Sequence, residues 1–226
     1  MFSEIIHLFF PRICFSCNYP LLTHEKILCI ACIHTLPRTR HTEIENNELF
    51  QKLYGRLPLI HASAYLYFHK KGNVQQLIHH LKYKNHQEIG TFLGQMYADE
   101  LQKIHSKTPF DAVIPVPLHQ KRMKERGYNQ VAEFGKTIAK SLKIPYYDTV
   151  LVRENYTETQ TRKKLLDRSF GQKTVFRAYY FKEMESKHFL IVDDVFTTGA
   201  TFEACGKALL TIPNAKISIA CLAYTH

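Results

Sequence analysis

Residues 189 to 201 read FLIVDDVFTTGAT, and this stretch decides the fold. Its first four residues are apolar without a polar break, which is typical of a strand buried on both faces of a parallel sheet. Two adjacent carboxylates, Asp193 and Asp194, end that run, and a hydroxyl-rich turn around Gly199 follows. A helical segment is expected from 201 to about 210. A buried strand that turns through glycine into a helix is the repeating unit of an α/β fold.

Working outward, the same alternation covers most of the chain. Asn73 is expected to cap a helix whose apolar residues Val74, Leu77, Ile78 and Leu81 recur at helical spacing. Further strands are expected at 61–68, 111–117 and 216–224, and further helices at about 87–104 and 127–142. The sequence therefore predicts a doubly wound parallel α/β sheet.

Composition narrows the class of protein. The chain has 226 residues, of which 45% are hydrophobic, and carries a formal net charge of +10, so it is expected to fold and to favour anionic partners. Phosphorylated small molecules, nucleic acid and acidic lipid surfaces all remain open. No apolar run approaches the roughly 18 residues of a membrane span. Residues 1–11 resemble a short amphipathic helix rather than a secretory signal, so we expect a cytosolic protein.

The stretch 193–201 has the chemistry of a sugar-phosphate site. Ligands of open α/β sheets bind beyond the carboxyl ends of the strands, and the start of a helix suits a phosphate. Sugar hydroxyls or a magnesium ion would occupy the two carboxylates. The phosphate contacts are expected from Thr197, Thr198, Gly199, Ala200 and Thr201. A Walker B strand and a receiver domain are the alternatives; the first needs a Gly-Lys-Ser/Thr loop that is not in the sequence. The second usually carries its acidic pair on the first strand.

Residues 192–201, VDDVFTTGAT, resemble the ribose-phosphate motif of type I phosphoribosyltransferases. More narrowly, the chain resembles the competence protein F (ComF) family through VPL at 116–118, RGYNQ at 126–130 and Thr159-Gln160 followed by Arg168 and Phe176. With the N-terminal cysteines, the resemblance spans nearly the whole chain. One departure is Gly171, which stands where the family usually has asparagine.

This resemblance implies a ligand and a role. The ligand is phosphoribosyl pyrophosphate with magnesium, whose ribose lies on Asp193 and Asp194 and whose pyrophosphate lies on Arg122 and Arg126. A guanidinium suits two phosphate oxygens. The role is in natural transformation, as a transferase whose acceptor the sequence does not identify. The alternative is a non-catalytic protein that handles single-stranded DNA and uses the site to sense a ligand. A helicase-like competence partner is also conceivable, although no residue identifies one.

Four of the six cysteines are closely spaced. Cys14, Cys17, Cys29 and Cys32 form two Cys-x-x-Cys pairs separated by eleven residues, whereas Cys205 and Cys221 lie in segments expected to be core. Such pairs predict a structural zinc site, and a redox dithiol is the competing interpretation. The predicted organisation is a zinc module at 1–37, a polar linker at 38–58 and a phosphoribosyltransferase-like domain at 59–226. A basic loop at 153–173 is either a lid over the site or a solvated segment.

Overall fold

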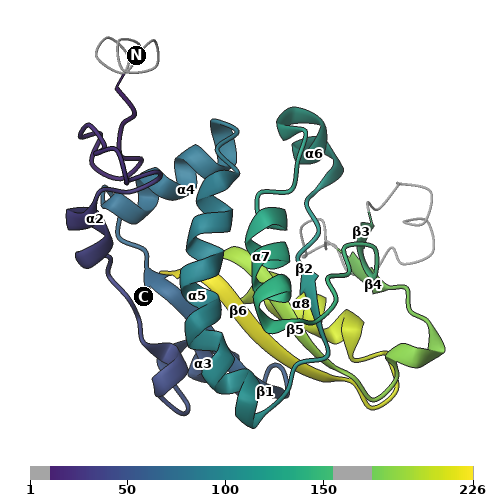
Figure 1. Ribbon diagram of the computed structural model, residues 1–226. Helices are drawn as coiled ribbons and strands as arrows, with labels where there is room; N and C mark the ends of the chain where they lie inside the picture. Colours follow the sequence, from purple (N-terminus) through teal and green to yellow (C-terminus); the bar gives the residue numbers. More distant parts are fainter. Residues whose placement is uncertain (1–10, 155–174, 226) are drawn as a thin grey trace.

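The computed structural model describes residues 11–154 and 175–225. Its centre is a four-stranded parallel sheet with the strand order β1-β6-β5-β2 (Figure 1). The strands are β1 (Leu59–Tyr67), β2 (Ala112–Pro115), β5 (His188–Phe196) and β6 (Lys216–Tyr224). The predicted strand at 216–224 is confirmed at both ends. The other predicted strands are present with shifted ends.

Helices cover both faces of this sheet, as the sequence predicted. Successive residues of β5 alternate between two buried clusters: Leu190 and Val192 belong to one, and Phe189 and Ile191 to the other. The first cluster includes α4 (Asn73–Tyr83), α5 (Glu88–Lys107) and α7 (Ala132–Leu142), and the second includes α3 (Glu48–Leu53) and α8 (Ala200–Leu209). Cys205 and Cys221 are fully buried in the second cluster, so their expected core role is confirmed.

The smaller elements complete the fold. The helix α2 (Ile30–His34) begins after its N-cap Cys29 and contains Cys32, and the 3-10 helices are η1 (His41–Glu43) and η3 (Lys182–Met184). The strands β3 (Leu151–Glu154) and β4 (Val175–Ala178) pair antiparallel. Among the described residues, no helix combines the length and apolarity that a bilayer crossing requires. The predicted leading helix and nearly all of the basic loop, including Thr159, Gln160, Arg168 and Gly171, lie outside the described residues.

Two local predictions differ from the structure. Gly72, not Asn73, is the N-cap of α4, and Asn73 is its first helical residue. The helix predicted at 127–142 begins only at Ala132, as α7, and the basic segment before it forms a separate helix, α6 (Gln120–Arg126), which ends where Gly127 adopts a left-handed conformation with φ of 78°. The basic residues before Gly127 are therefore helical.

The segment 38–58 was predicted as a polar linker, but it is a packed part of the fold. Leu49 and Leu53 of α3 are fully buried, and Leu57 is 4% exposed. Asn47 caps α3 by accepting the Phe50 N–H at 3.1 Å. Its amide also donates to the carbonyl of Ala62 in β1 at 2.8 Å. The polar composition of 43–48 concealed the three leucines, which are spaced by four residues and form one apolar face.

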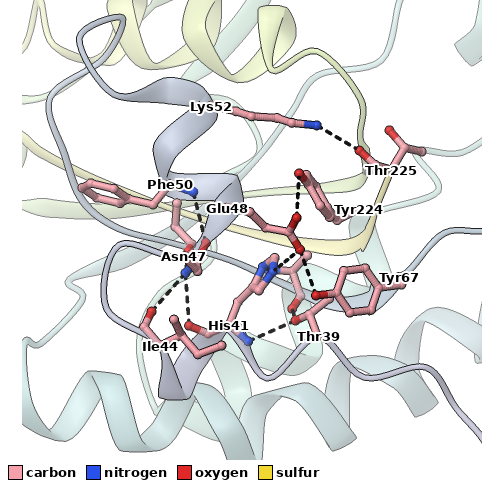
Figure 2. Close-up of polar contacts among 12 residues, drawn as sticks. Thr39, His41, Ile44, Asn47, Glu48, Phe50, Lys52, Tyr67, Tyr224 and Thr225 are labelled. Atoms are coloured by element: carbon pink, nitrogen blue, oxygen red, sulfur yellow. Dashed lines mark hydrogen bonds and ion pairs between the residues drawn. The ribbon is translucent and has the colours of Figure 1, made fainter.

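A polar cluster fixes this segment to the carboxyl ends of β1 and β6 (Figure 2). The Glu48 carboxylate accepts the Tyr67 hydroxyl at 2.8 Å and the Tyr224 hydroxyl at 3.4 Å. His41 lies on the same carboxylate at 3.4 Å through Nε2, while its Nδ1 faces the Ala64 N–H at 3.4 Å. Because Nδ1 accepts that N–H, the proton of a neutral His41 lies on Nε2 and is donated to Glu48.

Three histidines near the sheet give the first prediction, which concerns acid stability. Burial lowers the pKa of His41, of His188 and of His61, the last to about 4 with help from the other two imidazoles. These groups take up their protons at lower pH in the folded chain than in the unfolded chain, whose histidines have their ordinary pKa. The free energy of unfolding therefore falls as the pH decreases below about 6.5. His61, whose pKa of about 4 keeps it neutral in the folded chain over most of this range, contributes at most about 1.4 kcal/mol per pH unit.

Urea unfolding between about pH 7.5 and about pH 4.5 tests this sign. His61→Gln should lower the slope by the share of one histidine, whereas His24→Gln, at an exposed position, should leave it unchanged. An unchanged slope in His61→Gln would show that His61 takes up its proton in the folded chain.

Candidate functional site

The two aspartates lie at the carboxyl end of β5, where the strand leaves the sheet. Asp193 and Asp194 are still within β5, which extends to Phe196 and so runs further than the sequence predicted. Asp194 is 5% exposed and Asp193 is half-buried. Both line one cavity of about 410 Å³. A volume of this order suits a small ligand rather than a macromolecule.

The turn after β5 is built for close backbone approach. Gly199 has φ of 77° and is the N-cap of α8. A Cβ at this position would lie 2.7 Å from the Phe196 ring and 2.8 Å from Leu53, so the turn requires glycine. Thr197 and Thr201 line the cavity. Thr198 and Ala200 are exposed, and the Thr198 hydroxyl accepts the Ala200 N–H at 3.4 Å.

A residue of the packed segment 38–58 supports this turn from outside. Arg56 donates through Nη1 to the Thr198 carbonyl at 2.9 Å, and through Nη2 to Glu203 of α8 at 2.6 Å. The guanidinium thus joins the turn to the first part of the helix that follows it. The sequence analysis does not predict this role of Arg56, because it assigns the segment 38–58 to a linker.

The cavity lies where the parallel strands end. Its lining includes Phe68 after β1, Val116 to Leu118 after β2 and Thr225 after β6. The helix α4 forms one wall of the cavity with residues that are three and four positions apart in the helix, and further polar lining comes from other elements. The lining residues of α4 are Gln75, Ile78, His79, Lys82 and Tyr83, and the polar residues from elsewhere include Arg122, Gln130 and Arg153. The position agrees with the rule that ligands of open α/β sheets bind at the carboxyl ends of strands.

A hydrogen-bonded network holds Asp194. Its Oδ2 accepts Gln130 Nε2 at 2.8 Å and lies 3.0 Å from Lys82 Nζ. Arg126 donates through Nη1 to Gln130 Oε1 at 2.8 Å, and its guanidinium carbon lies 4.9 Å from the centre of the Tyr83 ring. Arg126 therefore supports the network, while Arg122 lines the cavity itself. Both assignments to pyrophosphate stay predictions.

The structure adds three side chains that sequence reasoning missed or undervalued. Lys82 is not among the side chains that the sequence analysis assigns to the site, yet it neutralises a buried carboxylate. Gln130 contributed only to the family resemblance, and Arg153 only to the basic loop. One signal was available for Lys82: it lies one helical turn after Ile78 and His79, at the border of the apolar face of α4. The pairing of Lys82 with a residue 112 positions further along has no local signature.

The cavity contains charges of both signs. Three cations, Lys82, Arg122 and Arg153, share its lining with the two aspartates. Burial, and then the charge of Asp194, raise the pKa of Asp193 to about 8. Asp193 Oδ1 accepts the Asp194 N–H at 2.8 Å. Such a site is able to hold hydroxyl groups or a divalent cation at the carboxylates and phosphate oxygens at the cations and the turn.

The four-cysteine module is a second candidate site. The ligand atoms of Cys14, Cys17, Cys29 and Cys32 all lie within 4.8 Å of one another, and the sulfurs of Cys17 and Cys29 are 3.8 Å apart. A tetrahedral ion with metal–sulfur bonds of about 2.3 Å keeps its sulfurs about 3.8 Å apart, so the cluster fits a metal ion.

The local environment gives the thiols of Cys14 and Cys32 different pKa values. Burial raises the pKa of Cys14, but the N–H groups of Cys29, Cys17 and Ser16 outweigh it and bring the pKa to about 7. Burial raises the pKa of Cys32 to about 12. The Glu25 carboxylate accepts the N–H groups of Leu22 and Ile30, each at 2.7 Å, and so fixes the chain around the second pair.

Comparison with known proteins identifies relatives. No family model matches the chain. DNA utilization protein YhgH of Escherichia coli strain K12 is 28% identical over 232 residues, which cover 95% of this chain and 98% of that protein. Competence protein F of Haemophilus influenzae is 30% identical over 147 residues, or 63% of this chain and 64% of that protein. A solved purine phosphoribosyltransferase from Pyrococcus horikoshii matches 60% of this chain and 73% of its own, with 21% identity and a TM-score of 0.40. The predicted resemblance to the ComF family is confirmed by the two sequence relatives.

The raised pKa of Asp193 gives a prediction about stability. Between about pH 4 and about pH 8 the folded chain keeps a proton on this carboxyl that the unfolded chain releases, so the residue destabilises the fold as the pH rises. Asp193→Asn keeps an oxygen for the Asp194 N–H and should raise the melting temperature near pH 8, by about 2 to 4 °C for each kcal/mol gained. The gain should shrink towards pH 4.

Thermal melts at several pH values measure this effect. The matched control is Asp148→Asn, which removes a carboxylate from an exposed position and should change the melting temperature little. A lower melting temperature for Asp193→Asn at pH 8 would mean that the ionised carboxylate stabilises the folded chain.

Proposed function

We propose that this relative of the competence and DNA utilization proteins binds phosphoribosyl pyrophosphate with magnesium in the cavity at the carboxyl ends of β5 and β6, and that it acts in the use of incoming DNA. The observation that carries the proposal is the meeting of two aspartates, a glycine–threonine turn and three cations in one lining. Each part alone is common. Together they match a ligand that has vicinal hydroxyls and phosphates at both ends.

The two aspartates would have different roles in binding the ribose. Asp194 is already held by Gln130 and Lys82 and is almost fully buried, so it is suited to orient its surroundings. Asp193 is the more accessible carboxyl and would accept the sugar hydroxyls. The two aspartates are the carboxylates that would help to hold a magnesium ion, which would supply positive charge beside the hydroxyl and pyrophosphate oxygens.

The 5-phosphate would lie on the turn from Thr197 to Thr201. Gly199 starts the ten-residue helix α8, whose first N–H groups have no partner within the helix. Thr197 and Thr201 line the same cavity and carry hydroxyl groups. The Arg56 contacts keep the turn in place, so little reorganisation is needed when the phosphate arrives.

The pyrophosphate would lie on the cationic side of the cavity. Arg122 is the predicted contact that lines it, and Lys82 and Arg153 extend the same positive lining. Arg126 would act through Gln130 and the Tyr83 ring. In a transfer reaction, an acceptor lone pair would attack the anomeric carbon as the C–O bond to pyrophosphate breaks, and the bond electrons would leave with pyrophosphate. The cations would stabilise that departing charge.

The four-cysteine module would hold one structural zinc ion. All four ligands are thiolates, which leaves no open position for a substrate. A segment of about forty residues buries too little apolar surface to fold alone, so metal binding would contribute directly to its folding. Two Cys-x-x-Cys pairs that converge on one point support this role better than a redox dithiol does.

Single-stranded DNA binding is the second candidate function. The names of the relatives and the net charge of +10 favour it. Four tyrosines are candidates for stacking on bases: Tyr128, Tyr156, Tyr179 and Tyr180. Tyr179 and Tyr180 are 54% and 39% exposed, whereas Tyr128 is held by a hydrogen bond to the Leu81 carbonyl at 2.6 Å. Tyr156 lies outside the described residues.

The ligand proposal predicts a calorimetric result. Titration of phosphoribosyl pyrophosphate with magnesium into the purified chain should show one binding site. Asp193→Asn and Arg122→Gln should each weaken binding by about tenfold or more, which corresponds to about 1.4 kcal/mol. Asp111→Asn is the matched control, because Asp111 binds the His188 N–H at the opposite end of β5 and should leave affinity unchanged.

Two outcomes would contradict the ligand proposal. One is no binding by the folded wild-type chain. The other is wild-type affinity in both cavity variants. Salt-sensitive binding of single-stranded DNA by a chain that does not bind the sugar phosphate would favour the second candidate.

The zinc proposal predicts a metal content of one ion per chain. Cys17→Ser removes an exposed ligand and should lose most of the metal and lower the melting temperature. Cys205→Ala changes a buried cysteine far from the module and should retain the ion. Mass spectrometry of the metal in purified protein measures both. Full zinc content in Cys17→Ser, or none in the wild-type chain purified with zinc, would contradict the assignment.

A further inference from the structure

The four-cysteine module contacts the helix that carries Lys82. Phe15, between the ligands Cys14 and Cys17, is half-buried. The centre of its ring lies 5.3 Å from the His80 ring in α4 and 4.4 Å from the His86 ring just beyond α4. His80 and His86 lie 5.5 Å apart, so the three rings form one cluster. The module therefore touches α4 in its last turn.

The last turn of α4 is also held from the other side. Tyr128 donates its hydroxyl to the Leu81 carbonyl at 2.6 Å, and the Leu81 side chain is 1% exposed. Lys82 follows directly and reaches Asp194 at 3.0 Å. His80, Leu81 and Lys82 are consecutive. Contacts to the first two therefore determine where the backbone of the third lies, and with it the ammonium group in the cavity.

Packing rather than hydrogen bonding positions the His80 ring. Its Nδ1 is buried and has no hydrogen-bond partner among the described residues. A ring held in this way depends on the neighbours that fill the space around it. Phe15 is one of those neighbours, and it is fixed in turn because the residues on both sides lead to metal-ligating sulfurs.

We propose that Phe15 is a positioning residue that couples the four-cysteine module to the cavity, so that the metal state of the module sets the placement of Lys82 and the affinity for the anionic ligand. This inference rests on the proposed function. Without a metal ion, the sulfurs of Cys14 and Cys17 lose their common centre, and the Phe15 ring loses its fixed position against His80. The last turn of α4 then loosens, and Lys82 neutralises Asp194 and phosphate oxygens less effectively.

A double-mutant cycle tests this coupling, because a stability role alone would leave affinity and coupling unchanged. Phe15→Ala should weaken the binding of phosphoribosyl pyrophosphate with magnesium by about fivefold while zinc stays bound. In a Lys82→Met background, Phe15→Ala should cause little further loss. Phe15→Tyr should keep the ring and restore affinity. Tyr19→Ala is the matched control, since Tyr19 is an aromatic residue of the same module that is 72% exposed.

Removal of zinc from the wild-type chain with a chelator should weaken binding to the same degree as Phe15→Ala. Equal affinity in Phe15→Ala and the wild-type chain, or losses that add fully in the double mutant, would overturn the coupling. Absence of binding by the wild-type chain would instead overturn the proposed function.

Hydrogen exchange decides the question without a ligand, including the case where the wild-type chain binds nothing. The amides of residues 80–84 should exchange faster in Phe15→Ala than in Tyr19→Ala. If Phe15→Ala does not fold, Phe15→Leu, which keeps apolar volume without an aromatic ring, takes its place in both measurements. Equal exchange in the Phe15 variant and the Tyr19 control would overturn the coupling.

Discussion

The buried carboxylate of Asp194 is the point on which the architecture of the cavity depends. One of its oxygens joins β5 to Lys82 of α4 and to Gln130 just before α7. Loss of one partner from a buried ion pair typically costs about 3 to 5 kcal/mol, although a well-packed apolar group in place of the whole pair is often as stable. The charge pair therefore stabilises the fold no better than apolar packing would. Its contribution is to place a lysine and an amide at the edge of the cavity.

The neighbouring carboxyl, that of Asp193, has a different environment. Asp193 lies beside the charge of Asp194 in a partly buried site, and its raised pKa expresses the cost of a second negative charge there. The charges of Lys82 and Arg153 already offset part of that cost, and a ligand that brings hydroxyl donors or a divalent cation would offset more of it. Adjacent groups with the same chemistry take different roles through their surroundings alone.

The sequence predicted those parts of the fold whose signals are local. The apolar run before Asp193, the spacing of Val74, Leu77 and Leu81, and the turn at Gly199 each determine an element from neighbouring residues. The prediction of a linker at 38–58 was wrong because the five polar residues within 43–48 outweighed leucines whose burial depends on β1. Lys82 and Arg56 were undervalued for the same physical reason. Their partners, Asp194 and Thr198, lie more than a hundred positions away, and no local pattern encodes such pairs.

The cysteine module is energetically part of the main domain rather than an appendage. Cys14, Leu28 and Cys32 belong to one continuous buried cluster with Leu77 of α4 and Leu222 of β6. Apolar surface that the module buries is also surface that α4 and α5 keep from water, so both sides lose stabilisation if the module opens. The binding energy of the proposed metal ion would therefore stabilise α4 and α5 as well as the module itself. Because the module packs against α4 instead of lying at the end of a free linker, the proposed ligand site would depend on the proposed metal ion.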